Sequence, residues 1–180
     1  MKLSLSAKLI LGFIGVSLIG AVIGLVGVAS LDRIRTADIS SYESGTQGLL
    51  IMLKATEAFD AIKVATRDEA LSVDDQENAR AAAAYREGLA KLKQAIADYG
   101  ATVADAEDKA NWENLKNTAA IYFPYTQQTI DLGVANKNAE AVALMHSAVV
   151  TKVRSDMVAA FQRVSDFNVK YTTDIYHSNL

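Results

Sequence analysis

The stretch from Leu9 to Leu31 carries no charged side chain and is made almost entirely of apolar residues and glycine. As a helix it would be roughly 34 Å long, enough to cross a bilayer core of about 30 Å. A core helix of a soluble protein would show a polar face, and this stretch has none. We therefore predict a transmembrane helix over residues 9–31.

A cleaved secretory signal is the alternative, with Gly27, Val28 and Ala29 as a small-residue cleavage site. The apolar region of a signal peptide is only about 7–15 residues long, so an uncleaved anchor is favoured. Gly20 and Gly24 lie four residues apart, a spacing that lets two membrane helices approach closely. Glycine is also common in membrane helices generally, so this spacing is a weak indication of self-association.

The orientation of the anchor is weakly specified by its flanking charges. Lysines precede the anchor, and Arg33 and Arg35 follow it, which nearly balances the positive-inside rule. A tail as short as residues 1–8 is easily left in the cytoplasm. We therefore predict that residues 1–8 are a cytoplasmic tail and that residues 32–180 form a domain outside the cytoplasm.

Charge and cysteine content exclude several classes of protein. The formal net charge is -3, whereas a nucleic-acid partner would require a basic surface. The chain has no cysteine, which removes disulfides, cysteine zinc sites, c-type haem attachment and thiol nucleophiles. We expect no nucleic-acid partner.

The residues after the anchor contain few helix breakers and much alanine, leucine, lysine and glutamate. Apolar residues recur there with a helical period, and turn residues interrupt the pattern near 72–74, 100–102 and 136–138. This predicts an all-α fold, an antiparallel up-down-up-down four-helix bundle that follows the N-terminal transmembrane helix. The expected helices cover about 31–71, 75–99, 103–134 and 139 to the C-terminal end.

Particular residues refine this expectation. Gly45 and Gly48 mark a soft spot in the first helix, and Pro124 predicts a kink or bulge in the third. The fourth helix has the clearest period, which places Val149 on its apolar stripe. Because the first and last helices are the longest, the turns after the first and third helices should lie at the membrane-distal tip.

The sequence offers little for catalysis. Carboxylate-bridged metal bundles use paired Glu-x-x-His motifs, but the only histidines are His146 and His177. The spacing of Asp174 and His177 is a single isolated near-match. No phosphate-binding loop or nucleophile elbow is present. We expect no enzymatic activity and no cofactor.

Basic and hydroxyl side chains near the distal tip form the candidate ligand site. Lys63, Thr66 and Arg67 lie on the first helix, and Thr151 and Lys152 on the fourth, with Arg154 nearby. Such groups can clamp a small carboxylate. A solvated helix face, with ion pairs to neighbouring aspartates, is the simpler interpretation of the same residues.

Aromatic residues of the third helix provide a second candidate. Trp112, Tyr122, Phe123 and Tyr125 lie close together in the sequence. Most such side chains pack in the core, but an aromatic-lined pocket for a planar ligand is the alternative if no anion clamp exists.

Several segments together carry a resemblance to a known family. They are the Lys-Leu-Ser start at 2–4, Ser30–Ile34, Trp112–Leu115, Tyr122–Tyr125 and Asn138–Ala141. With one membrane helix and a four-helix bundle, the chain resembles the N-terminal part of bacterial methyl-accepting chemotaxis receptors. The resemblance spans essentially all 180 residues and rests on architecture more than on signature residues.

The resemblance implies a location, an assembly and a ligand class. It implies a bacterial inner-membrane protein whose bundle lies in the periplasm, forms a homodimer and binds amino acids, organic acids or aromatic acids. Members of the family continue through a second membrane helix, a HAMP linker and a signalling hairpin, so this chain is expected to be the sensory part of a longer receptor. Only Arg67 lies where amino-acid receptors of the family place a ligand-binding arginine.

The predicted function is therefore that of a chemoreceptor sensor, in which a small molecule shifts the fourth helix relative to the first. Shifts of about 1–2 Å between packed helices are an established way of switching. Two alternatives remain open at this point: the same kind of bundle from a histidine kinase or cyclase, and a membrane-anchored structural bundle.

Overall fold

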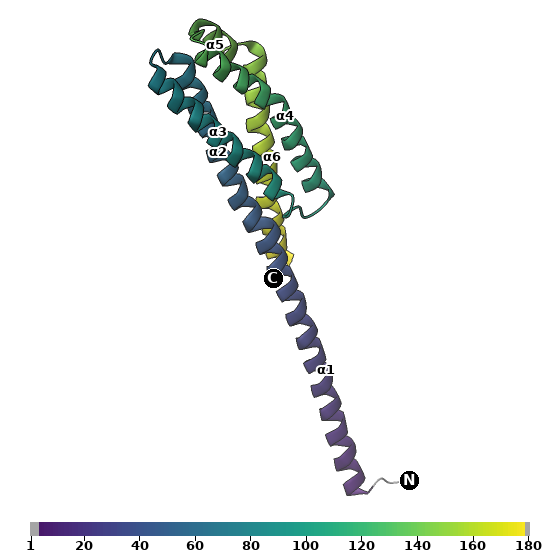
Figure 1. The fold of residues 1–180 in the computed structure, drawn as a ribbon. Coiled ribbons are helices and arrows are strands. Elements are labelled where there is room, and N and C mark those ends of the chain that lie inside the picture. Colours follow the sequence, from purple (N-terminus) through teal and green to yellow (C-terminus); the bar gives the residue numbers. More distant parts are fainter. Residues whose placement is uncertain (1–3, 179–180) are drawn as a thin grey trace.

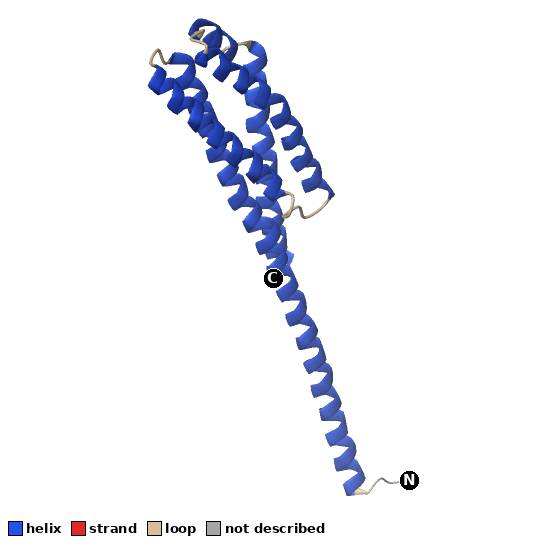
Figure 2. Cartoon of the chain, viewed as in Figure 1, coloured by secondary structure: helices blue, strands red, loops and turns tan. Residues whose placement is uncertain are grey.

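A computed structural model of the chain describes residues 4–178, so part of the predicted tail, residues 1–3, lies outside it. Within the described residues the fold is all-helical and contains no strand (Figure 2). The elements in order are α1 (Leu5–Ser40), the π-helix η1 (Ser41–Thr46), α2 (Gln47–Leu71), α3 (Asp75–Tyr99), α4 (Ala106–Val134), α5 (Asn138–Met145) and α6 (Ala148–Ser178).

The first three elements form one helical rod that runs from the N-terminal end into the bundle (Figure 1). Its segment Leu9–Thr36 is apolar and long enough to cross a membrane, and none of its most apolar window is buried by the rest of the chain. The predicted N-terminal apolar helix is therefore present and needs another apolar environment around it.

A soft spot was predicted at Gly45 and Gly48; Gly45 lies in η1, which interrupts the α-helix, and Gly48 lies just beyond it in the first turn of α2. A Cβ atom on Gly45 would lie 2.1 Å from the Thr172 hydroxyl oxygen, and one on Gly48 would lie 2.3 Å from the Asn168 amide oxygen. These glycines therefore let α6 lie directly against the rod at the membrane-proximal end of the bundle.

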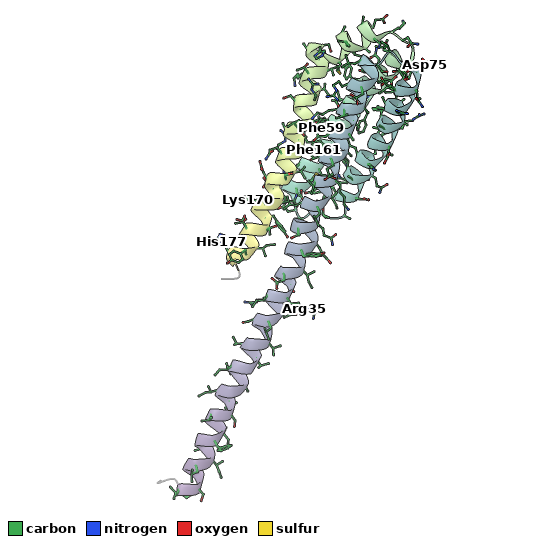
Figure 3. The ribbon with its side chains drawn as sticks, turned by 90° about the vertical axis from the view of Figure 1, so that its left-hand side faces the viewer. Arg35, Phe59, Asp75, Phe161, Lys170 and His177 are labelled. Atoms are coloured by element: carbon green, nitrogen blue, oxygen red, sulfur yellow. The ribbon has the colours of Figure 1, made fainter. Side chains whose placement is uncertain are left out.

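Helices α2, α3, α4 and α6 form the predicted four-helix bundle (Figure 1). The Phe59 ring lies at its centre, with centroids 5.2 Å from Tyr122 and 5.4 Å from Phe161, and Figure 3 shows Phe59 and Phe161 side by side. The largest fully buried side chains of the core include Tyr85, Tyr99, Met52, Ile62, Leu92, Leu115, Met157 and Val164.

Capping side chains decide where the middle helices begin. The Asp74 carboxylate accepts hydrogen bonds from the backbone N–H groups of Gln76 and Glu77, so α3 begins as predicted. Helix α4 begins three residues later than the predicted 103, because Asp105 is its N-cap and accepts from the Asp108 N–H. It then continues through Pro124 to Val134, so the proline does not end the helix.

The predicted fourth helix is wrong in one respect: it is two helices, α5 and α6, separated at His146 and Ser147. The Ser147 hydroxyl accepts a hydrogen bond from the Val150 N–H, which caps the new helix. The break shifts the helical phase, so Val149 is 52% exposed and Val150 is buried instead.

The turns that precede α3 and α5 lie together at the end farthest from the N-terminus, as predicted (Figure 1). Asp75 lies at this distal tip in Figure 3. Lys137 is the N-cap residue of α5, and Asn138 is the first residue of that helix. The Asn138 amide donates to the Ser72 carbonyl and joins the two distal turns.

Candidate ligand-binding site

A surface cavity of about 370 Å³ lies where α2, α5 and α6 meet near the distal tip. Four of its lining side chains are basic: Lys63, Arg67, His146 and Arg154. The remaining lining residues are apolar, namely Val64, Leu71 and Met145. The cavity therefore combines positive charge with apolar walls.

A smaller cavity of about 30 Å³ lies beneath it and shares Lys63, Met145 and Arg154. Hydroxyl groups line this floor, and the buried Thr126 hydroxyl is 3.0 Å from that of Tyr85. The other lining residues are Thr66, Tyr122, Thr129 and Val150. No acidic side chain is among the described residues that line either cavity.

The basic groups on α2 have partners at the surface. Lys63 Nζ is 2.6 Å from Asp60 Oδ1, and Arg67 is 2.8 Å from Asp68 Oδ1. Exposed pairs of this kind contribute little to stability and can exchange for a ligand carboxylate.

The charge of Arg154 on α6 affects the pKa of Tyr122, which lines the small cavity. Burial raises the pKa of the Tyr122 hydroxyl, and the positive charge of Arg154 opposes this rise. The charge of Arg154 therefore reaches the interior of the bundle as well as the cavity.

The structure brings together three of the five predicted site residues. Lys63, Thr66 and Arg67 line the two cavities. Thr151 and Lys152 are exposed and line neither cavity; Lys152 pairs instead with Asp156 at 2.7 Å. Participation of all five in binding stays a prediction.

His146 was not predicted as a site residue, and Arg154 was only expected near the site. Both are placed by the break between α5 and α6, since Ser147 restarts the helix and turns Val150 and Arg154 inward. Ser147, three residues before Val150, has the spacing of an N-cap and was the signal that could have revealed this.

The aromatic alternative brings no pocket together. The Trp112 indole N–H donates to the Ile96 carbonyl at 2.7 Å, and Lys116 Nζ lies 3.6 Å from the Trp112 ring centroid. Tyr122 instead packs on Phe59 in the core and reaches the small cavity. Ten residues of helix, roughly 15 Å, separate the two aromatic residues along α4.

A buried carboxyl group lies close to the cavity floor. The Glu69 side chain is 0% exposed, and neither of its oxygens has a hydrogen-bond partner; the Asn78 amide oxygen, also at the tip, has none either. Burial raises the pKa of Glu69, and the nearby backbone N–H of Ala82, which does not reach hydrogen-bond geometry, offsets part of this rise. Glu69 was not predicted to be buried, although it follows Ile62 and Thr66 on the same helical face.

A second buried carboxyl group, that of Asp108, lies at the membrane-proximal end and has partners. It accepts from the Tyr99 hydroxyl at 2.7 Å and from the Ala104 N–H at 3.0 Å. The Asn168 amide donates to the Tyr99 oxygen at 2.6 Å and thereby joins α6 to this group. Burial raises the pKa of Asp108, and the two donors lower it.

Comparison with known proteins identifies a matching protein family. The family described as a four helix bundle sensory module for signal transduction, that of chemotaxis receptors, matches residues 2–180. No curated protein and no solved structure matches the chain. Residues 4–178 contain no group of three or more potential metal-ligating side chains. The match covers nearly the whole sequence and agrees with the helical architecture, so the chain belongs to this family of sensory modules.

Proposed function

We propose that the chain is the extracytoplasmic sensory domain of a transmembrane chemoreceptor and that it binds a small organic anion in the basic cavity. The ligand class includes amino acids, organic acids and aromatic acids. One observation carries this proposal: Lys63, Arg67 and Arg154 reach one cavity from α2 and α6, and no acidic side chain lines it among the described residues.

The lining suits an anion with an apolar body. Arginine can hold a carboxylate through parallel N–H donors, and Lys63 supplies a further positive charge. Val64, Leu71 and Met145 offer apolar contact to the carbon skeleton. The anion would replace Asp68 as a partner of Arg67, at little cost because that pair is exposed.

Binding at this position would change how α2 and α6 interact. Positive groups on the two helices face one cavity, so they repel each other until an anion lies between them. An anion therefore favours an arrangement in which the helices are closer, which is the differential contact that a switch requires. A displacement of α6 by about 1–2 Å is within the range of known helix switches.

The proposal places α1 in a bacterial inner membrane and the bundle in the periplasm, as a parallel homodimer. Exposed apolar residues follow one face of α2 at spacings suited to a helix pair: Leu50, Leu53, Val64 and Leu71. Because the chain has no cysteine, Leu53→Cys should form a disulfide-linked dimer in membranes upon oxidation. A variant that stays monomeric, while Leu71→Cys also fails to cross-link, contradicts this assembly.

Calorimetric titration of the full chain in nanodiscs tests the anion site. The panel contains amino acids, dicarboxylates and aromatic acids, with Arg67→Ala and Arg154→Gln as the variants. Each should weaken binding of the tightest acid by roughly 1.5–3 kcal/mol, the range for a charge-assisted hydrogen bond.

Lys152→Gln is the matched control, since Lys152 is a basic residue on α6 that lines neither cavity. We expect it to leave the affinity unchanged. If an acid binds and neither arginine variant weakens it, the anion clamp is wrong. A large loss with Lys152→Gln would instead favour the site predicted from the sequence alone.

A further inference from the structure

Glu69 is an unusual residue for the interior of a helical bundle. Its side chain is 0% exposed, and neither oxygen has a hydrogen-bond partner among the residues that the structure describes. An ionised carboxylate without a partner is strongly disfavoured away from water, so such a group takes up a proton instead. The surroundings therefore select the neutral carboxylic acid.

Packing holds this carboxyl group in place. A Cβ atom added to Gly133 on α4 would lie 2.5 Å from Glu69 Cγ and 2.8 Å from the Glu69 carbonyl oxygen. Only glycine allows α4 to approach Glu69 so closely. The Glu69 side chain already lies against α4 at this point, since its Oε1 atom would be 3.1 Å from the same added Cβ atom.

The charged side chains of the neighbouring elements lie at the surface of the tip. Lys137 lies 3.6 Å from Glu140, Arg67 pairs with Asp68, and Glu77 accepts from the Ser72 hydroxyl. None of these groups hydrogen-bonds to Glu69. Other exposed titratable residues near the tip include Lys63, Asp74, Asp75, Arg80, Asp131 and His146.

Glu69 is also close to the proposed ligand site. It follows Thr66 by three residues on α2, about 4.5 Å along the helix axis, and Gly133 follows Thr129 by four residues on α4. Both threonines line the small cavity. The carboxyl group is therefore about one helical turn from the cavity floor, where a negative charge on it would repel a bound anion.

We propose that the Glu69 carboxyl is a proton-binding site of the distal tip, and that the basic cavity takes up an anion together with this proton. The coupling to an anion rests on the proposed function, whereas the proton site does not. Because coupling is reciprocal, an anion in the cavity tightens proton binding by the same factor by which the proton tightens anion binding.

The proton site is tested without any ligand. Thermal unfolding of the full chain in nanodiscs is followed from pH 5 to pH 8.5 for the wild type, Glu69→Gln and Glu57→Gln. A carboxyl group whose pKa is raised on folding stabilises the fold at low pH, and this stabilisation is lost as the pH rises through the folded pKa.

The wild type and Glu57→Gln, whose altered residue is exposed on the same helix, should therefore lose thermal stability as the pH rises. Glu69→Gln should lose most of this dependence, with the rest due to Asp108. If the thermal stability of Glu69→Gln falls with pH as steeply as that of the wild type, Glu69 is not the proton-binding site. If that variant does not fold, the infrared band of a protonated carboxyl group at pH 7, absent from Glu69→Met, decides the question.

The coupling is tested by titrating benzoate, succinate and glutamate into the wild type and Glu69→Gln at pH 5.5, 7 and 8.5. Wild-type affinity for the acid that binds should fall about fivefold or more as the pH rises, the lower end of typical coupling. Glu69→Gln should bind with a much weaker pH dependence. His146 is common to both proteins, so the comparison isolates Glu69.

The two parts fail in different ways. If an acid binds with the same pH dependence in both proteins, the coupling is wrong and the anion site stands. If none of the three acids binds at any pH, the coupling fails together with the proposed function for these acids. The unfolding experiment then judges the proton site by itself.

Discussion

The two ends of the bundle each bury a carboxyl group, but they treat it in opposite ways. At the membrane-proximal end Asp108 accepts hydrogen bonds from the Tyr99 hydroxyl and the Ala104 N–H, and Asn168 completes the network from α6. At the distal end Glu69 has no partner for either oxygen. The proximal carboxyl group is both buried and hydrogen-bonded, whereas the distal one is buried without hydrogen bonds from the described residues.

The difference indicates which end is fixed and which can respond. Satisfied buried networks hold one arrangement, because any shift breaks several bonds at once. At the proximal end the Asn168 amide oxygen also lacks a partner among the described residues, but the Asp108 carboxylate has two donors. The distal end instead leaves both oxygens of its carboxyl group without one, and it also contains two adjoining cavities and the break between α5 and α6. Regions of this kind open at lower free energy than the core, as ligand-responsive regions require.

Removing Asp108 is the strongest way to break this comparison. Asp108→Ala leaves the Tyr99 hydroxyl and the Ala104 N–H without their acceptor, so the free energy of unfolding should fall by about 3 kcal/mol. Urea unfolding at pH 7 measures it. Asp108→Asn keeps one acceptor oxygen and should lose less. Equal losses for both would mean that shape, not hydrogen bonding, matters at this end.

Filling the glycine contact at the proximal end should have the next largest effect. A Cβ atom on Gly48 would lie 2.3 Å from the Asn168 amide oxygen and 3.2 Å from Tyr99 Cε2, so the Asn168 side chain would have to leave its place in the proximal network. Gly48→Ala should lower the unfolding free energy by about 2 kcal/mol, as overpacking commonly does.

Gly24→Ala, in the same rod, is the control for this change, because nothing lies within 4 Å of its added Cβ. It should leave the unfolding of the bundle unchanged. If Gly48→Ala were equally harmless, the close contact between α6 and the rod would not be what fixes the proximal end.

The smallest expected effect is at the distal tip. Asn138→Ala removes the amide that donates to the Ser72 carbonyl and should lower stability by about 1 kcal/mol. Amide hydrogen exchange should rise in the two distal turns and stay constant around Tyr99. Faster exchange at both ends would show that the bundle opens as one unit and would remove the contrast between them.

Much of the fold could be predicted from the sequence because helical periodicity and capping residues are local signals. The apolar stretch after Leu9, the α3 bounds set by Asp74 and the soft spot at Gly45 all appear in the structure. The division between α5 and α6 was missed, because the apolar period of the sequence continues across it and the cap at Ser147 is a single residue.

The candidate site was predicted only in part, because two of its lining residues, His146 and Arg154, lie at or just after the unpredicted break between α5 and α6. Lys63 and Arg67 lie on an unbroken helix, so their shared face followed from their spacing. Lys152 was expected at the site, but it is exposed and pairs with Asp156, although its neighbour Val153 is buried as the apolar stripe predicts. Glu69 was missed for another reason: acidic residues are rarely buried without a partner, so composition argues against the position that its helical phase gives it.

The π-helix at Ser41–Thr46 has a geometric consequence for the anchor. An α-helix turns by about 100° per residue, and each π-type hydrogen bond encloses one residue more than an α-type bond. The azimuth of the anchor relative to α2 is therefore offset from that of an uninterrupted α-helix by about one residue step. If the bundle were transplanted onto another anchor, a junction that omitted this segment would turn a different side of the anchor toward its neighbours.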